Sequence, residues 1–209
     1  MTTVGLQRQL AGPQRFCQTC SRADPKCFQG NAEVSSPTHP DSAIVLELAR
    51  AADAPIIATM SRALIEVGLR WSWTPQRVAR EIRDRNTNVL VGRAGSRMAA
   101  FAIMRYGETH AHLNLLAVDP RYRRRGVGRR MMEWLEESAV VAGIGEIGLE
   151  VRVSNPVARR FYRTLGYTEI GLLQGYYCGV EAAVGMKRSL LVAPAMPPRE
   201  HFSVWPISR

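Results

Sequence analysis

The segment 118–130 carries the strongest chemical signal in the chain. A strand-like apolar run ends at Asp119-Pro120, six arginines follow, and Gly126 and Gly128 stand just before a helical pattern begins. Glycines permit tight turning and close backbone approach, so several N–H groups can point at one anion, and a helix N-terminus adds its positive dipole end. Arginine stays charged and binds phosphate oxygens in a fork. The pattern predicts a cradle for a pyrophosphate or another ligand with several phosphates.

Two other interpretations of the same residues remain open. A short Arg-x-x-Gly-x-Gly pattern arises by chance in chains rich in Arg and Gly, and clustered arginines also form solvated helix faces or patches for nucleic acid. Context favours the anion cradle, because a strand precedes the loop, a helix follows it, and a second motif lies downstream.

The second motif is Leu149–Pro156, where a buried-strand pattern runs directly into a helix start. Asn155 suits the N-cap, where its side chain accepts from a free helix N–H, and Pro156 fits the first helical position. Gly166 is placed to end the helix. These signals predict a strand that contains the polar residue Glu150 and runs directly into a helix.

The geometry of this unit brings two polar groups to one level. From Glu150 to Val153 the strand advances about 10 Å, and from Asn155 to Tyr162 an antiparallel helix returns about 10.5 Å. Tyr162 is therefore expected level with Glu150. A carboxylate and a phenol near a phosphate cradle suit acid–base chemistry. The alternative is that Glu150 pairs with an arginine and Tyr162 only packs.

Hydrophobic periodicity between the two chain ends predicts an α/β (α+β) fold with a mixed, mostly antiparallel sheet flanked by helices. Strands are expected at 44–48, 88–93, 98–106, 109–118, 147–153, 167–173 and 181–187. Helices are expected at 53–67, from a Thr74 cap to about Asn86, at 126–141 and at 156–165. In the first helix the apolar residues that recur at helical spacing are Ile56, Ile57, Met60, Leu64 and Val67. The resulting order is β-α-α-β-β-β-α-β-α-β-β.

Composition bounds the class of protein. The 209 residues with 46% hydrophobic content suffice for one domain with a core. The 28 basic against 18 acidic residues give a net charge of +10, which favours phosphate-bearing ligands, ribosomal surfaces or acidic partners. No apolar run reaches the length of a membrane span, and the N-terminus lacks the pattern of a signal peptide. We therefore expect a cytoplasmic protein without a membrane partner.

The two ends of the chain differ in composition from the middle. Residues 1–42 and 191–209 are rich in proline and lack sustained periodicity, which predicts a disordered N-terminal extension, a domain at 43–190 and an irregular C-terminal tail. One sharper alternative exists for the N-terminal segment. A zinc site is conceivable there, although a single CxxC without a second pair is a weak zinc signal; its ligands would be Cys17, Cys20, Cys27 and His39.

Three segments together resemble the GNAT superfamily of acetyl-CoA-dependent N-acetyltransferases. They read VDPRYRRRGVGRRMMEWLE, LEVRVSNPVARRFYRTLGY and GYYCGVEAAVGMKR, and the resemblance spans about residues 43–188. Within the superfamily the chain most resembles the RimI-type ribosomal-protein alanine N-acetyltransferases. The resemblance implies a GNAT fold, acetyl-CoA as the acetyl donor and a protein N-terminal α-amine as the acceptor, including that of a ribosomal protein. It implies no metal.

The resemblance also implies roles for individual residues. Glu150 would be the general base and Tyr162 the general acid, and Tyr176 and Tyr177 would shape the acceptor site. The residues implied to contact acetyl-CoA are Leu116, Val118, Arg123, Arg124, Arg125, Gly126, Val127, Gly128, Arg129 and Asn155.

The chain departs from the RimI-type pattern at two positions. Glu181-Ala182-Ala183 stands where that type usually has Glu-Asp-Ala, and Pro156 replaces a typical Ala. The acceptor-side helices carry no diagnostic residues, so acetyl-CoA binding is better supported by the sequence than the identity of the acceptor.

The acceptor is constrained by amine chemistry. Protein α-amines have a pKa near 7.7–8.0 and lysine near 10.4, so at pH 7 roughly a tenth of the former but only about 0.04% of the latter is neutral. A carboxylate base therefore suits an α-amine better. His110 and His112 are reserve candidates for the base. The alternative functions are acetylation of a small amine and, from another class, a non-catalytic acetyl-CoA-responsive protein that binds RNA or a ribosome.

Overall fold

A seven-stranded sheet forms the centre of residues 43–190, the part of the chain that the computed structural model describes. The strand order is β1-β2-β3-β4-β5-β7-β6. Every neighbouring pair is antiparallel except β4 and β5, which are parallel. The zinc ligands considered above, Cys17, Cys20, Cys27 and His39, lie outside the described residues, as do both chain ends.

The elements follow the predicted order. The strands are β1 Val45–Leu48, β2 Thr87–Ala94, β3 Arg97–Tyr106, β4 His110–Val118, β5 Glu146–Arg152, β6 Thr168–Tyr177 and β7 Glu181–Ser189. The helices are α1 Ala54–Leu64, α2 Pro75–Arg83, α3 Val127–Val141 and α4 Pro156–Thr164, with short 3-10 turns at Ala51–Asp53 and Pro120–Tyr122. The predicted fold class, a mixed and mostly antiparallel sheet flanked by helices, is confirmed.

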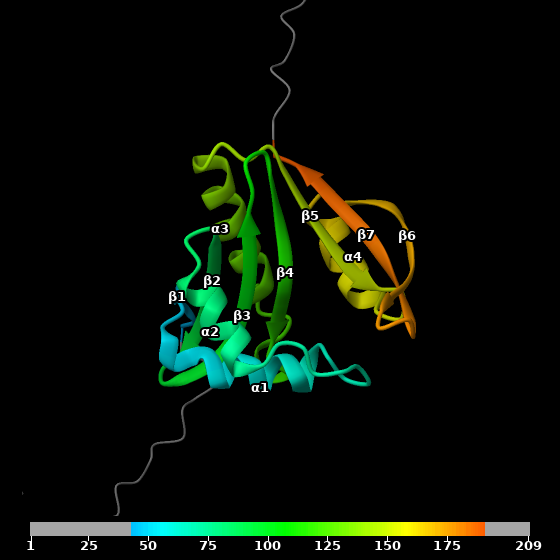
Figure 1. The fold of residues 1–209 in the computed structure, drawn as a ribbon. Helices are drawn as coiled ribbons and strands as arrows, with labels where there is room; N and C mark the ends of the chain where they lie inside the picture. The colour runs from blue at the N-terminus through cyan, green and yellow to red at the C-terminus, as the bar shows by residue number, and fades with distance from the viewer. Residues whose placement is uncertain (1–42, 191–209) are drawn as a thin grey trace, which may run out of the picture. The chain divides into compact units, whose positions relative to one another are not determined.

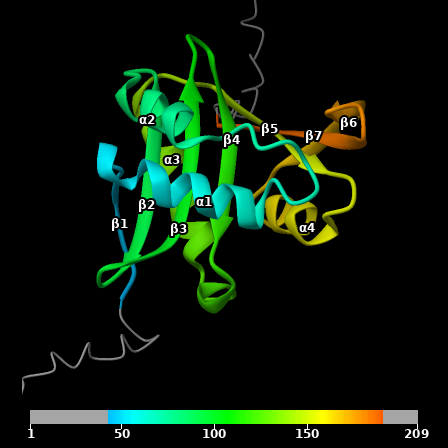
Figure 2. The same cartoon turned by 60° about the horizontal axis from the view of Figure 1, so that its bottom comes forward.

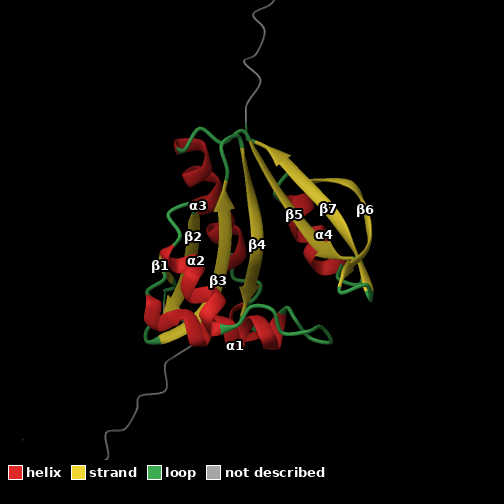
Figure 3. Ribbon diagram, viewed as in Figure 1, coloured by secondary structure: helices red, strands yellow, loops and turns green. Residues whose placement is uncertain are grey.

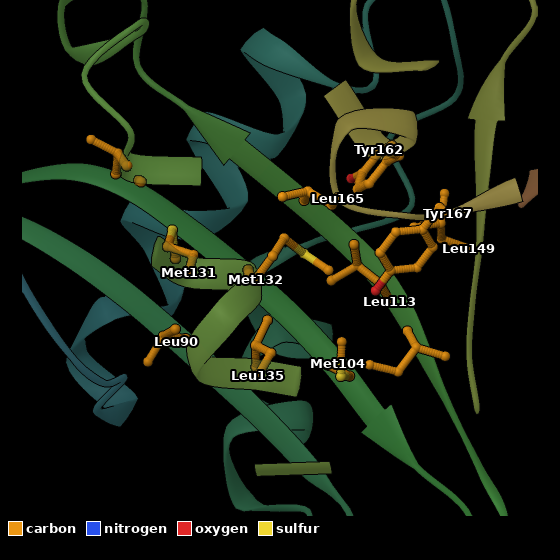
Figure 4. Packing of buried hydrophobic residues seen from close by; sticks show 14 of the residues in the cluster. Leu90, Met104, Leu113, Met131, Met132, Leu135, Leu149, Tyr162, Leu165 and Tyr167 are labelled. Atoms are coloured by element: carbon orange, nitrogen blue, oxygen red, sulfur yellow. The ribbon is translucent and has the colours of Figure 1, made fainter. Parts of the chain in front are cut away.

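The helices cover the two faces of the sheet in pairs (Figures 1 and 2). One core cluster lies between the sheet and the helices α3 and α4, with Met131, Met132 and Leu135 of α3 at its centre. The other lies between the sheet and the helices α1 and α2, where Ile57 and Val78 are buried. Figure 4 shows the first cluster from close by. Burying large apolar side chains of this kind contributes about 1.5–3 kcal/mol each.

The first helix is shorter than its apolar spacing predicts. It ends at Leu64, and Val67 lies beyond it with 61% of its surface exposed. Gly68 follows with a φ of 77°, a left-handed conformation that ends helices readily. Ile56, also on the apolar stripe, is 48% exposed. The segment after Leu64 therefore forms a loop rather than a further helical turn.

A β-bulge in β4 reorients its side chains. Ile103 and Met104 of β3 pair with Leu115 and Leu113, so Asn114 is the extra residue on β4. Leu113 consequently packs in the α3/α4 cluster, whereas Leu115 packs in the α1/α2 cluster. Without the bulge two residues spaced by two would share a face. The bulge lies at the same point where the pairing of β4 with β5 ends.

No helix within residues 43–190 is long and apolar enough to cross a membrane.

Candidate active site

The two central parallel strands part in the middle of the sheet. Pairing of β4 with β5 extends only from His110 with Glu146 to Leu113 with Leu149. Beyond that point β4 continues to Val118 without further ladder pairs to β5 in the described chain, and the strands diverge toward their C-terminal ends (Figure 3). The backbone groups of 114–118 on this edge are therefore open to an extended ligand.

Glu150 is the first residue of β5 beyond the paired stretch. Its Oε2 atom lies 2.9 Å from His112 Nε2 and accepts a 2.9 Å hydrogen bond from the Tyr176 hydroxyl. Burial raises the pKa of this carboxyl, but the hydrogen bond and charge of His112 and the hydrogen bond from Tyr176 outweigh burial and hold the pKa below its usual value. Glu150 is thus ionised at neutral pH and can accept a proton.

Tyr162 lies on the opposite face of β5 from Glu150. It belongs to the α3/α4 cluster together with Leu149 and Val151, the strand neighbours of Glu150 (Figure 4). Because successive side chains of a strand point to opposite faces, Glu150 points toward the α1/α2 side. Glu150 and Tyr162, expected at one level from the sequence, are thus separated by the strand.

The environment of Tyr162 keeps its phenol protonated. The side chain is buried, with 8% of its surface exposed, and its ring makes an edge contact with Tyr167 at 5.7 Å between centroids. Burial raises the pKa of Tyr162 well above its usual range. Among the described residues its hydroxyl has no hydrogen-bond partner, and this oxygen is not fully shielded from solvent. A proton donor in such a position is free to serve a ligand.

The loop before α3 has the backbone that the glycine pattern predicted. Gly126 is the N-cap of α3 in a left-handed conformation, with φ 74°, and no atom lies within 4 Å of a Cβ added to it. Arg124 also has a positive φ, 63°. The N–H of Arg130 bonds the carbonyl of Gly126 at 3.0 Å, so the N–H groups of 127–129 precede the helical ladder. They are available to an anion.

Gly128 is needed for a different reason from Gly126. A Cβ at Gly128 would lie 3.3 Å from Phe161 Cζ and 3.8 Å from Val118 Cγ2, so this glycine allows α3 and α4 to approach closely. The neighbouring Val127 is buried in the α3/α4 cluster. These contacts fix the start of α3 relative to the end of β4.

The predicted cofactor arginines surround this helix start with exposed charge. Arg123 donates from Nε to the carbonyl of Val118 at 3.0 Å, which joins two predicted cofactor residues at the end of β4. Leu116 and Val118 are half-buried against the α3/α4 cluster. All four predicted cofactor arginines are exposed: Arg123, Arg124, Arg125 and Arg129.

Asn155 caps α4, as its position in the sequence predicted. Its side chain accepts a 3.0 Å hydrogen bond from the N–H of Ala158, and Pro156 occupies the first helical position. A direct contact of Asn155 with the cofactor stays a prediction. The cap itself fixes the turn that follows β5, and thereby the position of α4 and Tyr162.

The loop between α1 and α2 is built around a buried carboxylate. Glu66, with 4% of its surface exposed, accepts hydrogen bonds at Oε1 from the N–H of Ser72 at 2.6 Å and of Trp73 at 3.3 Å, and at Oε2 from the Ser61 hydroxyl at 3.1 Å. A buried charge needs several such partners. Glu66 therefore holds this loop in a defined shape on the Glu150 side of the sheet.

Arg152 connects the same loop to the strands beside Glu150. It donates to the carbonyl of Val67 at 2.9 Å, lies 3.6 Å from a carboxylate oxygen of Glu181, and its guanidinium is 5.5 Å from the ring centre of Tyr177. Glu181 in turn bonds the hydroxyl and N–H of Ser154. Arg152 was not among the predicted site residues, although its place two residues after Glu150 puts it on the same face.

Tyr176 and Tyr177 lie at the end of β6, which extends four residues beyond its predicted limit. Their rings meet edge to face at 5.0 Å. Burial, followed by the hydrogen bond to Glu150, raises the pKa of Tyr176 to about 12. Burial and the charge of Glu150 raise the pKa of Tyr177 to about 12. Both phenols are protonated at neutral pH and border the face to which Glu150 points.

The arrangement thus has two sides that meet where β4 and β5 part. On one side lie the exposed arginines and the open start of α3, together with the protonated phenol of Tyr162. On the other side lie the ionised carboxylate of Glu150, the two tyrosines of β6 and the α1–α2 loop. Such a site suits transfer of a group from an anionic donor on one face to a proton-losing acceptor on the other.

The chain resembles known acetyltransferases in sequence. The chain is 42% identical over 84 residues to the ribosomal protein bS18-alanine N-acetyltransferase of Salmonella typhimurium, a match that covers 40% of this chain and 57% of that protein. It is 34% identical over 109 residues to the N-alpha-acetyltransferase RimI of Mycobacterium tuberculosis, covering 50% of this chain and 67% of that protein.

A solved structure extends the comparison to the fold. The crystal structure of the ribosomal-protein-S18-alanine N-acetyltransferase from Escherichia coli matches with a TM-score of 0.64 and 27% identity, over 74% of this chain and 99% of that one. The family model described as Acetyltransferase (GNAT) family matches residues 59–167, which is more than half of the chain. This protein therefore belongs to the GNAT acetyltransferase family and is an N-acetyltransferase.

Proposed function

We propose that the protein transfers the acetyl group of acetyl-CoA to the N-terminal α-amine of a protein, with a ribosomal protein as the first candidate acceptor. The observation that carries the proposal is the ionised Glu150 at the parting of β4 and β5, on the face opposite the arginine loop. The proposal assigns residues 43–190 as the acetyltransferase domain.

The residues present fit acetyl-CoA. Its pyrophosphate fits the start of α3, where Gly126 leaves open space, the N–H groups of 127–129 precede the helical ladder, and four exposed arginines lie nearby. Its extended pantetheine arm fits the open edge of β4 at 114–118, which includes Leu116 and Val118. Asn155, at the start of α4, completes the proposed binding residues.

When bound, acetyl-CoA supplies a thioester that an amine can attack directly. Glu150 then takes the proton lost by the amine, and Tyr162 gives a proton to the departing thiolate. A backbone N–H of β4 near Val118 stabilises the developing oxyanion. The pKa directions of both groups match these roles, because Glu150 is ionised and Tyr162 is protonated at neutral pH.

Amine chemistry and the relatives support an α-amine acceptor. At neutral pH a useful fraction of a protein α-amine is already uncharged, whereas lysine is almost entirely protonated. The lowered pKa of Glu150 makes it a modest base, which suits the more acidic ammonium. Two relatives are named as an alanine N-acetyltransferase of ribosomal protein bS18 and as an N-alpha-acetyltransferase. Tyr176, Tyr177 and the α1–α2 loop are the proposed acceptor contacts.

The proposal is tested by thiol release from acetyl-CoA with a panel of acceptors. The panel contains peptides that differ in their first residue, the same peptides with a blocked N-terminus and an internal lysine, and a set of small amines. We expect activity confined to free peptide N-termini. Activity only on small amines would move the function to metabolite acetylation, and silence despite tight acetyl-CoA binding would favour a non-catalytic role.

A further inference from the structure

His112 reaches Glu150 across the paired stretch of β4 and β5. The register aligns His112 with Gly148, two residues before Glu150 on the parallel strand. The ring spans this offset and places Nε2 2.9 Å from Oε2 of the carboxylate. Because an ionised carboxylate can only accept hydrogen bonds, the proton between the two atoms belongs to the imidazole.

Gly148 provides the space for this contact. A Cβ at position 148 would lie 3.7 Å from Nδ1 of His112, so the ring lies directly over the glycine. An added methyl group would meet the ring in ordinary contact, whereas a branched side chain would compete with it for the same space. The pairing of His112 with Glu150 is therefore built into two strands and does not depend on a mobile loop.

The two donors to Glu150 converge on one oxygen. His112 and the hydroxyl of Tyr176 both bind Oε2, and among the described residues Oε1 has no hydrogen-bond partner. A carboxylate held in this way has one oxygen occupied and one oxygen able to accept. The side chain of His112 is 38% exposed and that of Glu150 20%, so solvent reaches the pair.

We propose that His112 is a positioning residue for Glu150: it holds Oε2 so that Oε1 takes the proton of the acceptor amine. The inference rests on the proposed role of Glu150 as the base. As the amide bond forms and the thioester bond breaks, the amine proton moves to Oε1 and the thiolate gains a proton from Tyr162. His112 keeps its own proton throughout, so no further reactant is needed.

Other charged and titratable groups border this face of the sheet. Lys187 of β7 pairs with Glu146 of β5 at 2.9 Å, and Arg152 of β5 pairs with Glu181 of β7 and the Val67 carbonyl. Tyr176 and Tyr177 of β6 stay protonated, since their pKa values are raised to about 12. His110 of β4 contacts the Thr109 hydroxyl at 3.2 Å.

His110 and His112 both lie on β4, but only His112 is paired with Glu150 in the described structure. His112 is therefore the histidine whose loss should disturb the position of the carboxylate.

The test compares His112→Gln, His112→Ala and the matched control His110→Gln in the full chain. The readouts are kcat and KM for an N-terminal peptide at pH 8, and the Kd of acetyl-CoA. Glutamine retains an N–H donor, so it should keep most of the wild-type kcat. Alanine should lower kcat at pH 8 by about tenfold or more, because a hydrogen bond to a charged group is lost. His110→Gln should match the wild type.

The outcomes separate this inference from the proposed function. If the wild type acetylates peptides and Glu150→Gln does not, the base is supported. An equal loss of kcat in His112→Gln and His112→Ala, or kcat within twofold of wild type in His112→Ala, would then overturn the role of His112 alone. A merely structural role would lower the melting temperature of both variants, with no recovery of kcat in His112→Gln. A wild type inactive on every peptide would instead reject the proposed function.

Discussion

Gly126 offers a quantitative test of how the anion cradle is built. Its φ of 74° and ψ of 0° are left-handed, and no atom lies within 4 Å of an added Cβ. Gly126→Ala therefore meets no steric contact and carries only the backbone cost, about 1–2 kcal/mol for a residue with a Cβ in this conformation. For a domain of this size each kcal/mol shifts Tm by roughly 2–4 °C, so a fall of about 2–8 °C is expected.

Gly126→Asn is the matched variant. Asparagine visits the left-handed region more readily than alanine, so it should recover about half of the lost Tm. Both side chains enter the space that we assign to the pyrophosphate, so both variants should bind acetyl-CoA more weakly. The assays are thermal unfolding of the full chain and calorimetric titration of acetyl-CoA. Equal Tm values for wild type, Ala and Asn would refute the strain argument, and unchanged affinity would refute the assignment of the cradle.

Three further predictions follow from single contacts. Tyr162→Phe should leave Tm unchanged, because the hydroxyl has no partner among the described residues. The same variant should lower kcat by about 10²-fold or more. An unchanged kcat in thiol release would exclude Tyr162 as the acid. Arg152→Met breaks the 2.9 Å hydrogen bond to the Val67 carbonyl and should raise the peptide KM severalfold, with the Kd of acetyl-CoA unchanged. A weaker Kd of acetyl-CoA with an unchanged peptide KM would contradict the place of Arg152 on the acceptor side. Burial raises the pKa of Glu136 despite the nearby Arg188, so the folded state binds this proton more tightly than the unfolded state. The contribution of Glu136 to the free energy of unfolding should then fall as pH rises from its unfolded-state pKa to its folded-state pKa. Glu136→Gln should flatten that part of the pH–stability curve. An unchanged slope in the variant would disprove the raised pKa of Glu136.

The order of elements was predictable because the local signals along the chain agree with the fold. Thr74 caps α2, Asn155 caps α4, and Gly126 begins α3, each as its residue type favours. These signals act within a few residues, so the sequence carries them directly. The fold class and family followed from them, because two motifs at the right spacing on a strand–loop–helix pattern leave few alternatives.

The predictions from sequence were wrong where tertiary contacts override the local pattern. The apolar spacing predicted a first helix as far as Val67, whereas Glu66 turns inward and organises a loop instead. The bulge at Asn114 has no local signature, although it decides which face Leu115 occupies. Tyr176 reaches Glu150 only because β6 runs four residues further than its periodicity indicated.

Within the candidate site, individual residues could be predicted from the sequence more readily than the contacts between them. Glu150 was identified, and His112 was considered only as a substitute base, because a register between two strands is not visible in either strand alone. The signal that connects them is Gly148, a glycine inside a buried-strand pattern, which often marks close approach of another group. The assigned roles in cofactor and acceptor binding stay predictions.

The most direct test of the central claim is the rate of thiol release by Glu150→Gln with an alanine-initiated peptide at pH 8, compared with the wild type. The amide preserves size and can still accept from His112 and Tyr176, but it cannot take a proton. Loss of a general base lowers kcat by about 10²–10⁴-fold, and acetyl-CoA affinity should be retained because Glu150 lies on the face opposite the arginine loop. A variant that turns over at the wild-type rate would contradict the account.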